Sequence, residues 1–106
     1  METNIRQISP RELERLLQDG VLVVDVRTPL EQATARIEGA RLLDDAFYDE
    51  LCALDRSTPI AFHCHHGMRS QEAAEHFASL GFTSLYNLAG GIDAWSAEVD
   101  PRVPRY

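Results

Sequence analysis

The sequence predicts a layered α/β domain, in which helices cover a sheet of parallel strands. Short apolar runs alternate with segments of helical periodicity along the chain, a pattern typical of this class. The segment 21–26, VLVVDV, is almost continuously apolar and β-branched, as in strands that are buried on both faces of a parallel sheet. A length of 106 residues suits one domain with a single core.

The first predicted helix begins at Ser9, which can cap it, with Pro10 in its first turn and Glu12 completing a capping box. Leucines then recur on one face, and Gly20 ends the helix. The strand over 21–26 follows. Next come a short helical or irregular stretch over 29–36, a short strand over 39–43 and a helix over 46–54.

The second half of the chain repeats the alternation of strand and helix. A second buried strand over 59–63, PIAFH, precedes a helix over 70–80, which turns small and apolar side chains inward and ends at Gly81. A last strand over 84–88 leads through two glycines into a short helix that carries Trp95 in the core. The tail over 97–106 contains two prolines and is expected to be extended.

Composition restricts the function classes. Lys and Arg total 10 against 17 Asp and Glu, a formal charge of −7, whereas nucleic acids and anionic membranes bind basic surfaces. No apolar run approaches the ~18 residues of a membrane span, and residues 1–6 lack the apolar region of a signal peptide. We therefore expect a cytoplasmic protein that acts on neither nucleic acid nor membrane.

The chain has two cysteines, Cys52 and Cys64, and a disulfide is not expected in a cytoplasmic protein. Cys52 lies among apolar residues and is expected to be core or half-buried. Cys64 follows the apolar strand over 59–63 and precedes a helix. Ligands of parallel sheets bind outside the carboxyl ends of the strands, so Cys64 is placed where an active site is expected.

Three features favour a thiolate at Cys64. The first N–H groups of the following helix attract an anion, Gly67 can adopt a left-handed turn that aims loop N–H groups inward, and Arg69 adds a positive charge. A pKa of roughly 3.5–7.5 is expected for a thiol in such a setting. Lowering a thiol pKa by about two units needs roughly 2.7 kcal/mol, of which a helix terminus supplies up to about 2 kcal/mol.

Three segments in the same order resemble the rhodanese family of sulfurtransferases. They are the active-site loop 64–70, CHHGMRS; the segment 25–40, with DVR, Glu31 and IEGA; and the segment 88–95, LAGGIDAW. The resemblance spans about residues 5–95. It implies a three-layer sandwich with a central five-stranded, mainly parallel sheet flanked by helices. We expect one rhodanese-like domain over 1–106, with 97–106 as a C-terminal tail.

The resemblance also implies a chemistry. Cys64 would take the outer sulfur of a small anionic donor such as thiosulfate, form a persulfide, and pass that sulfur to a thiol, cyanide or a protein acceptor. Backbone N–H groups of the loop would hold the donor and the persulfide; the loop residues are His65, His66, Gly67, Met68, Arg69 and Ser70. Asp25 and Arg27 are expected to be a buried polar support, and no cofactor is expected.

Alternatives remain open beside this interpretation. Phosphatases and arsenate reductases of this fold have one more residue in the loop than the four between Cys64 and Arg69, so the shorter loop favours sulfur. A carrier module that holds sulfur without turnover is the other alternative. Arg69 could instead close a salt bridge. A metal at the histidines around Cys64 is not expected, because consecutive residues point in different directions.

Overall fold

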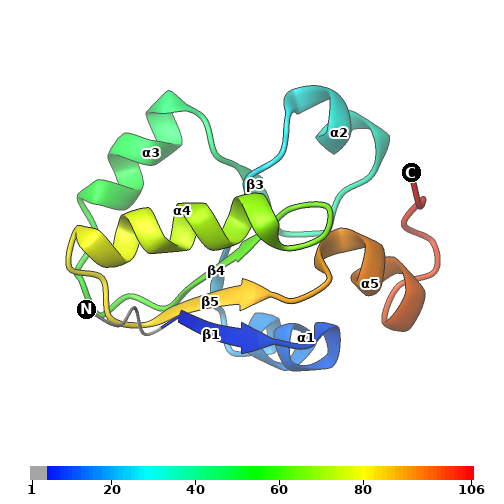
Figure 1. Ribbon diagram of the computed structural model, residues 1–106, viewed down its shortest axis with the longest axis horizontal. Helices are drawn as coiled ribbons and strands as arrows, with labels where there is room; N and C mark the ends of the chain where they lie inside the picture. The colour runs from blue at the N-terminus through cyan, green and yellow to red at the C-terminus, as the bar shows by residue number, and fades with distance from the viewer. Residues whose placement is uncertain (1–4) are drawn as a thin grey trace.

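The computed structural model describes residues 5–106, and among these residues five strands form one parallel sheet (Figure 1). The strands are β1 (Ile5–Ile8), β2 (Leu22–Asp25), β3 (Arg41–Leu42), β4 (Ile60–His63) and β5 (Leu85–Leu88). Their order is β1-β5-β4-β2-β3, and each neighbouring pair is parallel. The predicted fold class is confirmed. β4 occupies the centre, so the residue that follows it lies between the ends of β2 and β5.

Helices fill the connections between the strands. They are α1 (Pro10–Gln18), α2 (Pro29–Thr34), α3 (Asp45–Cys52), α4 (Met68–Ser79) and α5 (Gly91–Glu98). Ser9 and Glu12 form the predicted capping box at α1, through hydrogen bonds of 3.1 and 3.2 Å. Thr28 and Glu31 form an equivalent box, which caps the start of the short helix α2.

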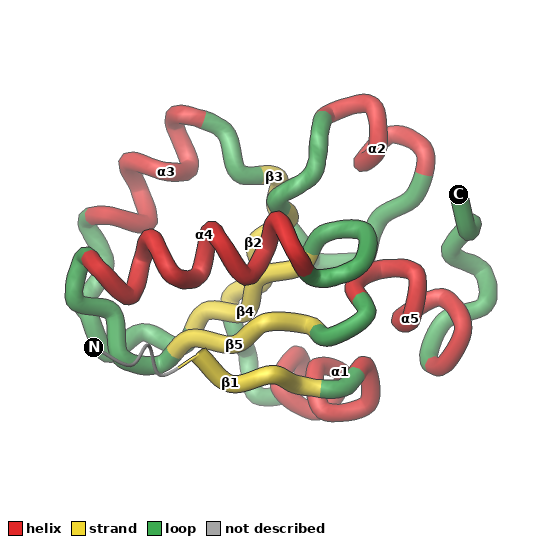
Figure 2. The backbone as a smooth tube through the Cα atoms, in the orientation of Figure 1, coloured by secondary structure: helices red, strands yellow, loops and turns green. Residues whose placement is uncertain are grey.

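Two apolar clusters, one on each face of the sheet, make the three layers. In Figure 2, α4 runs across the strands on the same side as α3. These two helices pack on one face through Phe47, Phe62 and Phe77, whereas α1 and α5 pack on the other through Leu13 and Trp95. Adjacent residues of β2, Val23 and Val24, belong to different clusters, as the alternation of side chains along a strand requires.

The structure corrects several element bounds. β1 was not predicted. Helix α4 begins at Met68, two residues before the expected start, which brings the first helical N–H groups closer to Cys64. The expected extended tail over 97–106 is partly wrong, because Ala97 and Glu98 still belong to α5 and residues 101–103 form a turn. Ser96 holds that turn with a hydrogen bond to the Val103 carbonyl, and the Val103 side chain is buried.

None of the helices between residues 5 and 106 combines the length and the apolarity that crossing a bilayer requires. The interpretation of residues 1–6 as lacking a signal peptide, and the expected domain start at residue 1, fall partly on residues 1–4. Those four residues lie outside the described part of the chain.

Candidate active site

Cys64 is the first residue after the central strand β4, at the carboxyl edge of the sheet. Only 1% of its surface is exposed. Its sulfur is therefore protected from bulk solvent and surrounded by the groups of its own loop. Cys52 lies at the end of α3 and is half-buried, as predicted, and neither cysteine is in a disulfide.

The sulfur of Cys64 accepts hydrogen bonds from the loop that follows it. The backbone N–H of Gly67 lies 3.1 Å from Sγ, and the Ser70 hydroxyl lies 3.4 Å from it. Burial raises the pKa of the Cys64 thiol. The Ser70 hydroxyl and the backbone N–H groups of Ser70, Gly67 and His66 outweigh burial, so the net pKa is lowered. The contacts therefore favour the thiolate that a nucleophilic cysteine needs.

The backbone of the loop is shaped from two sides. Gly67 has a φ of +104°, the left-handed conformation that was predicted for it, and it directly precedes α4. On the opposite side, the carbonyls of Cys64 and His65 accept hydrogen bonds of 2.9 and 3.2 Å from the first N–H groups of α5. A side chain at Gly91 would collide with these carbonyls. Because the carbonyls turn toward α5, the loop N–H groups are left to face the sulfur.

A buried polar chain supports Ser70 from β5. The Ser70 hydroxyl lies 2.5 Å from Asn87 Oδ1, and the Asn87 amide donates to the Gly67 carbonyl at 3.1 Å and to Gln7 Oε1 at 2.9 Å. Ser70 is fully buried and Asn87 nearly so. The single proton of the Ser70 hydroxyl is shared between Asn87 Oδ1, the nearer acceptor, and the Cys64 sulfur. Asn87 thus fixes both Gly67 and Ser70, the two residues whose groups contact that sulfur. Asn87 was not predicted as a site residue, although it is a polar residue inside the otherwise apolar strand LYNL.

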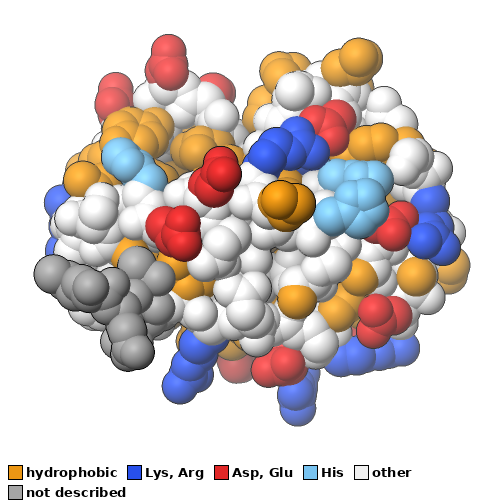
Figure 3. Space-filling view, in the orientation of Figure 1, with side chains coloured by type: hydrophobic (Ala, Val, Ile, Leu, Met, Phe, Trp, Pro, Cys, Tyr) orange, Lys and Arg blue, Asp and Glu red, His pale blue; other side chains and the backbone are white. Residues whose placement is uncertain are grey.

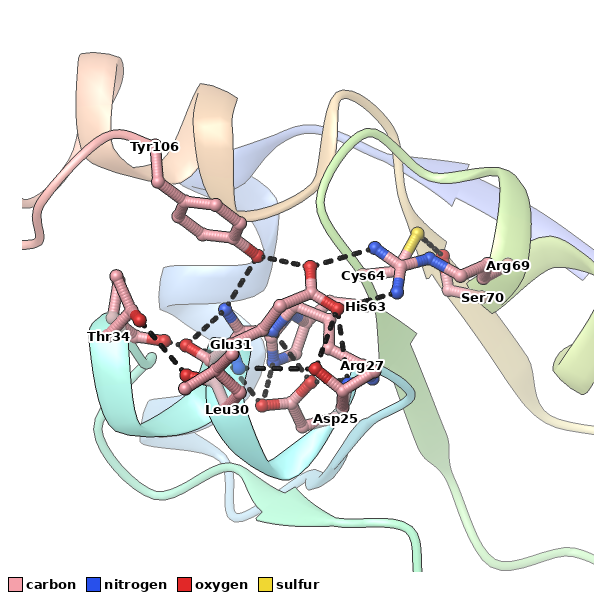
Figure 4. Close-up of polar contacts among 12 residues, drawn as sticks. Asp25, Arg27, Leu30, Glu31, Thr34, His63, Cys64, Arg69, Ser70 and Tyr106 are labelled. Atoms are coloured by element: carbon pink, nitrogen blue, oxygen red, sulfur yellow. Dashed lines mark hydrogen bonds and ion pairs between the residues drawn. The ribbon is translucent and has the colours of Figure 1, made fainter.

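Arg69 closes the salt bridge that the sequence left open as an alternative. Its two terminal nitrogens lie 2.7 and 3.0 Å from the two carboxylate oxygens of Glu31 on α2 (Figure 4). The Tyr106 hydroxyl donates to the same carboxylate at 2.7 Å. The Arg69 guanidinium, and then the Tyr106 hydroxyl, hold the pKa of Glu31 well below its ordinary value. Hydrogen bonding to Glu31 raises the pKa of Arg69, and the nearby Cys64 adds to the rise.

Asp25 and Arg27 form a fully buried ion pair behind this network. Arg27 Nη2 and Nε lie 2.7 and 2.8 Å from the two Asp25 oxygens, and neither side chain is exposed. Arg27 also donates to the carbonyls of Ala35 and Glu31 and to the Tyr106 hydroxyl. The pair therefore ties the segment around α2 to the end of β2, which is the arrangement expected of a support.

The histidines differ in environment. His63 is fully buried, and burial lowers its pKa to about 4, so it is neutral at physiological pH. The rings of His65 and His66 lie at the loop, and the His65 ring packs 4.3 Å from that of Tyr106. His65, His66 and Asp93 offer potential metal-ligand atoms within 4.8 Å of one another. Arg105 already bonds both oxygens of Asp93, at 3.0 and 3.1 Å, so a metal would have to displace it.

The structure brings most of the predicted residues together. Gly67, Ser70 and the backbone of His66 face the Cys64 sulfur, whereas the Met68 side chain is 80% exposed and points away from the core. Arg27 reaches the site through the Glu31 carbonyl and the Tyr106 hydroxyl, and Asp25 lies 3.8 Å from His63, the residue before Cys64. Glu31 and Tyr106 were not predicted as site residues. Glu31 belongs to a quoted motif, but no sequence signal connected Tyr106 with the loop.

Fold and loop together define a parallel α/β domain built around one hydrogen-bonded thiol at the end of its central strand. The model of the rhodanese-like domain matches residues 9–98. Two relatives, each called thiosulfate sulfurtransferase GlpE, come from Ectopseudomonas mendocina and Pseudomonas aeruginosa. They are 36% and 35% identical over 96 residues, which are 90% of this chain and 88% and 87% of theirs.

A solved structure of a rhodanese-like domain protein from Staphylococcus aureus is 28% identical, with a TM-score of 0.74. The match covers 96% of this chain and 99% of that one. The chain therefore belongs to the rhodanese-like domain family, and it is a rhodanese-type sulfurtransferase. Membership of this family implies a sulfur donor and a thiol acceptor.

Proposed function

We propose that Cys64 takes the outer sulfur of a donor such as thiosulfate, holds it as a persulfide, and transfers it to a thiol, cyanide or a protein acceptor. The observation that carries the proposal is the buried Cys64 sulfur with donors from Gly67 and Ser70 and a lowered pKa. The names of the GlpE relatives, which specify thiosulfate, support the choice of donor.

The proposed first step is a displacement at sulfur. The Cys64 thiolate attacks the outer sulfur of thiosulfate, a new S–S bond forms, and sulfite leaves with the electron pair of the bond that breaks. An acceptor thiolate then attacks the outer sulfur of the persulfide and restores the Cys64 thiolate. The negative charge stays near the loop in both steps, where the N–H groups that face Sγ stabilise it.

No step in this proposal uses a metal or a cofactor. Residues His65 to Ser70 form the proposed binding loop for the donor.

We propose that the chain works as one domain in the cytoplasm, where free thiols are maintained. The surrounding acidic surface, with a formal charge of −7, gives no attraction to nucleic acid or to anionic lipid.

Two other functions compete with turnover of small donors. A phosphatase or arsenate reductase would need room for a tetrahedral oxyanion, and the four-residue spacing between Cys64 and Arg69 disfavours it. A carrier module would form the persulfide but release it only to a partner protein. Turnover with a small donor and a small thiol distinguishes an enzyme from a carrier.

Intact mass after incubation with thiosulfate tests the proposal. Wild type and Cys52→Ser are expected to gain the mass of one sulfur atom, which a thiol removes, and Cys64→Ala is expected to gain none. Cys52→Ser is the matched control, because Cys52 lies on α3 and is half-buried. A sulfur adduct on Cys64→Ala, or none on wild type with either thiosulfate or 3-mercaptopyruvate, would refute the proposed persulfide.

A further inference from the structure

Glu31 forms an ion pair with the guanidinium of Arg69, the group that was expected to lie near an anionic donor. Both terminal nitrogens of Arg69 bond the two oxygens of Glu31, at 2.7 and 3.0 Å, in the bidentate geometry that makes such pairs strong. The Arg69 side chain is 46% exposed, whereas that of Glu31 is only 19% exposed. The positive charge at the loop is therefore matched by a negative charge that is anchored in the protein.

Three separate segments hold the Glu31 carboxylate in place. Besides Arg69 on α4, its oxygens accept hydrogen bonds from the backbone and hydroxyl of Thr28, each at 3.2 Å. The Tyr106 hydroxyl donates to it at 2.7 Å, and Tyr106 is itself held by Arg27 at 2.9 Å. A carboxylate with this many donors does not swing aside as an isolated surface pair does, so the pairing persists when a ligand arrives.

The other arginines of the network are occupied in the same way. Arg27 bonds Asp25 and Arg105 bonds Asp93, so that, with Arg69 and Glu31, all three arginines of this network pair with a carboxylate. On the face drawn in Figure 3, the basic side chains, all of them arginines, lie next to Asp and Glu side chains rather than in one broad basic patch. The site therefore offers hydrogen-bond donors without a free guanidinium.

We propose that Glu31 determines which sulfur donors the site accepts: by occupying Arg69 it favours donors of low charge, such as persulfides and thiosulfonates, over the thiosulfate dianion. Tyr106 is a positioning residue that keeps Glu31 on Arg69. The inference rests on the proposed sulfur transfer at Cys64. Its physical basis is that a fixed negative charge repels a dianion twice as strongly as a monoanion at the same position.

Glu31→Gln tests this directly, because glutamine keeps the capping box at α2 but removes the charge. The probes are thiosulfate, a dianion, and benzenethiosulfonate, a monoanion that donates sulfur in the same way. We expect kcat/KM to rise about tenfold for thiosulfate and about threefold for benzenethiosulfonate, since the logarithm of the gain should scale with donor charge. Both gains should shrink as ionic strength increases.

Glu50→Gln is the matched control. Glu50 also pairs in bidentate fashion with an exposed arginine, Arg41, so the change removes the same net charge from a comparable pair on α3. The ratio of the two kcat/KM values should stay at the wild-type value in Glu50→Gln and in Glu31→Asp, which keeps the charge. Tyr106→Phe should move the ratio in the direction of Glu31→Gln, by about twofold, although its ring is retained.

A second measurement does not require sulfur transfer. Sulfate should protect Cys64 from alkylation by the neutral reagent iodoacetamide, at about tenfold lower concentration in Glu31→Gln than in wild type. The role of Glu31 would be overturned if Glu31→Gln and wild type showed the same ratio of kcat/KM for thiosulfate and benzenethiosulfonate and the same protection of Cys64 by sulfate. Failure of the persulfide assay together with altered sulfate protection would instead reject the proposed function and leave the control of anion binding by Glu31 standing.

Discussion

The backbone N–H of Gly67 donates to the Cys64 sulfur over 3.1 Å, and this contact depends on a glycine conformation with φ at +104°. A Cβ at Gly67 would also meet the Leu88 carbonyl at 3.3 Å and the Gly90 nitrogen at 3.5 Å. The loop geometry that lowers the Cys64 pKa therefore requires the absence of a side chain at this position.

Gly67→Ala is accordingly expected to raise the pKa of Cys64 toward that of an ordinary thiol and to reduce sulfur transfer by tenfold or more. Stability should fall by about 1–2 kcal/mol, the strain of a left-handed alanine. The pH dependence of Cys64 alkylation by iodoacetamide measures the pKa, and urea unfolding measures the stability.

Gly20→Ala separates backbone strain from the effect on the thiol. Gly20 follows α1, has a φ of +83°, and has open space where its Cβ would lie. This variant should lose similar stability but alkylate with the wild-type pH profile. A wild-type profile in Gly67→Ala as well would contradict the assignment of the Gly67 N–H as a thiolate donor.

Local sequence signals predicted the features that local interactions create. Ser9 and Glu12 lie three residues apart and form the capping box that their spacing indicated. Cys64 and Gly67 lie in one short loop between a strand and a helix, so its left-handed turn was also predictable. β1 was missed because a four-residue strand at the sheet edge, IRQI, has only two apolar residues, and its two middle residues are exposed.

Long-range contacts were not predictable from the single sequence. Arg69 and Glu31 are 38 positions apart, Tyr106 and Glu31 are 75 apart, and Asn87 and Gln7 are 80 apart. Side chains of these types are found on most surfaces, so nothing in their local context marks them as partners. The order β1-β5-β4-β2-β3 and the turn in the tail bring them together.

The buried pair of Asp25 and Arg27 is expected to show strong energetic coupling. Both side chains are 0% exposed, so Arg27→Met leaves a buried carboxylate without its main partner and should reduce stability by about 3–5 kcal/mol. Asp25→Leu should be similarly harmful. The double variant should be much less destabilised than the sum of the two, because neither charge remains.

Urea unfolding of the wild type, the two single variants and the double variant gives the coupling energy. The same cycle on Arg41 and Glu50, whose side chains are 51% and 59% exposed, serves as the control and should give at most about 1 kcal/mol. Additive effects at Asp25 and Arg27 would show that the ion pair is not a supporting unit.

His63 should make the protein sensitive to mild acid. Burial, opposed in part by the Asp25 carboxylate 3.8 Å away, lowers the folded-state pKa of His63 to about 4. A histidine in the unfolded chain titrates near 6.5. As pH falls through this range the unfolded state binds the proton first, so the free energy of unfolding decreases with falling pH.

The expected loss is about 2 kcal/mol between pH 7 and pH 5, and about 3 kcal/mol once the pH is below 4. Urea unfolding at pH 7, 6 and 5 measures it. His63→Gln should lose stability at pH 7 but show a smaller decline toward pH 5, because the titrating ring is gone. His76→Gln, at an exposed position on α4, should retain the wild-type decline. If His63→Gln and wild type lose stability in parallel over this range, another group is responsible and the neutral, buried state of His63 is not the cause.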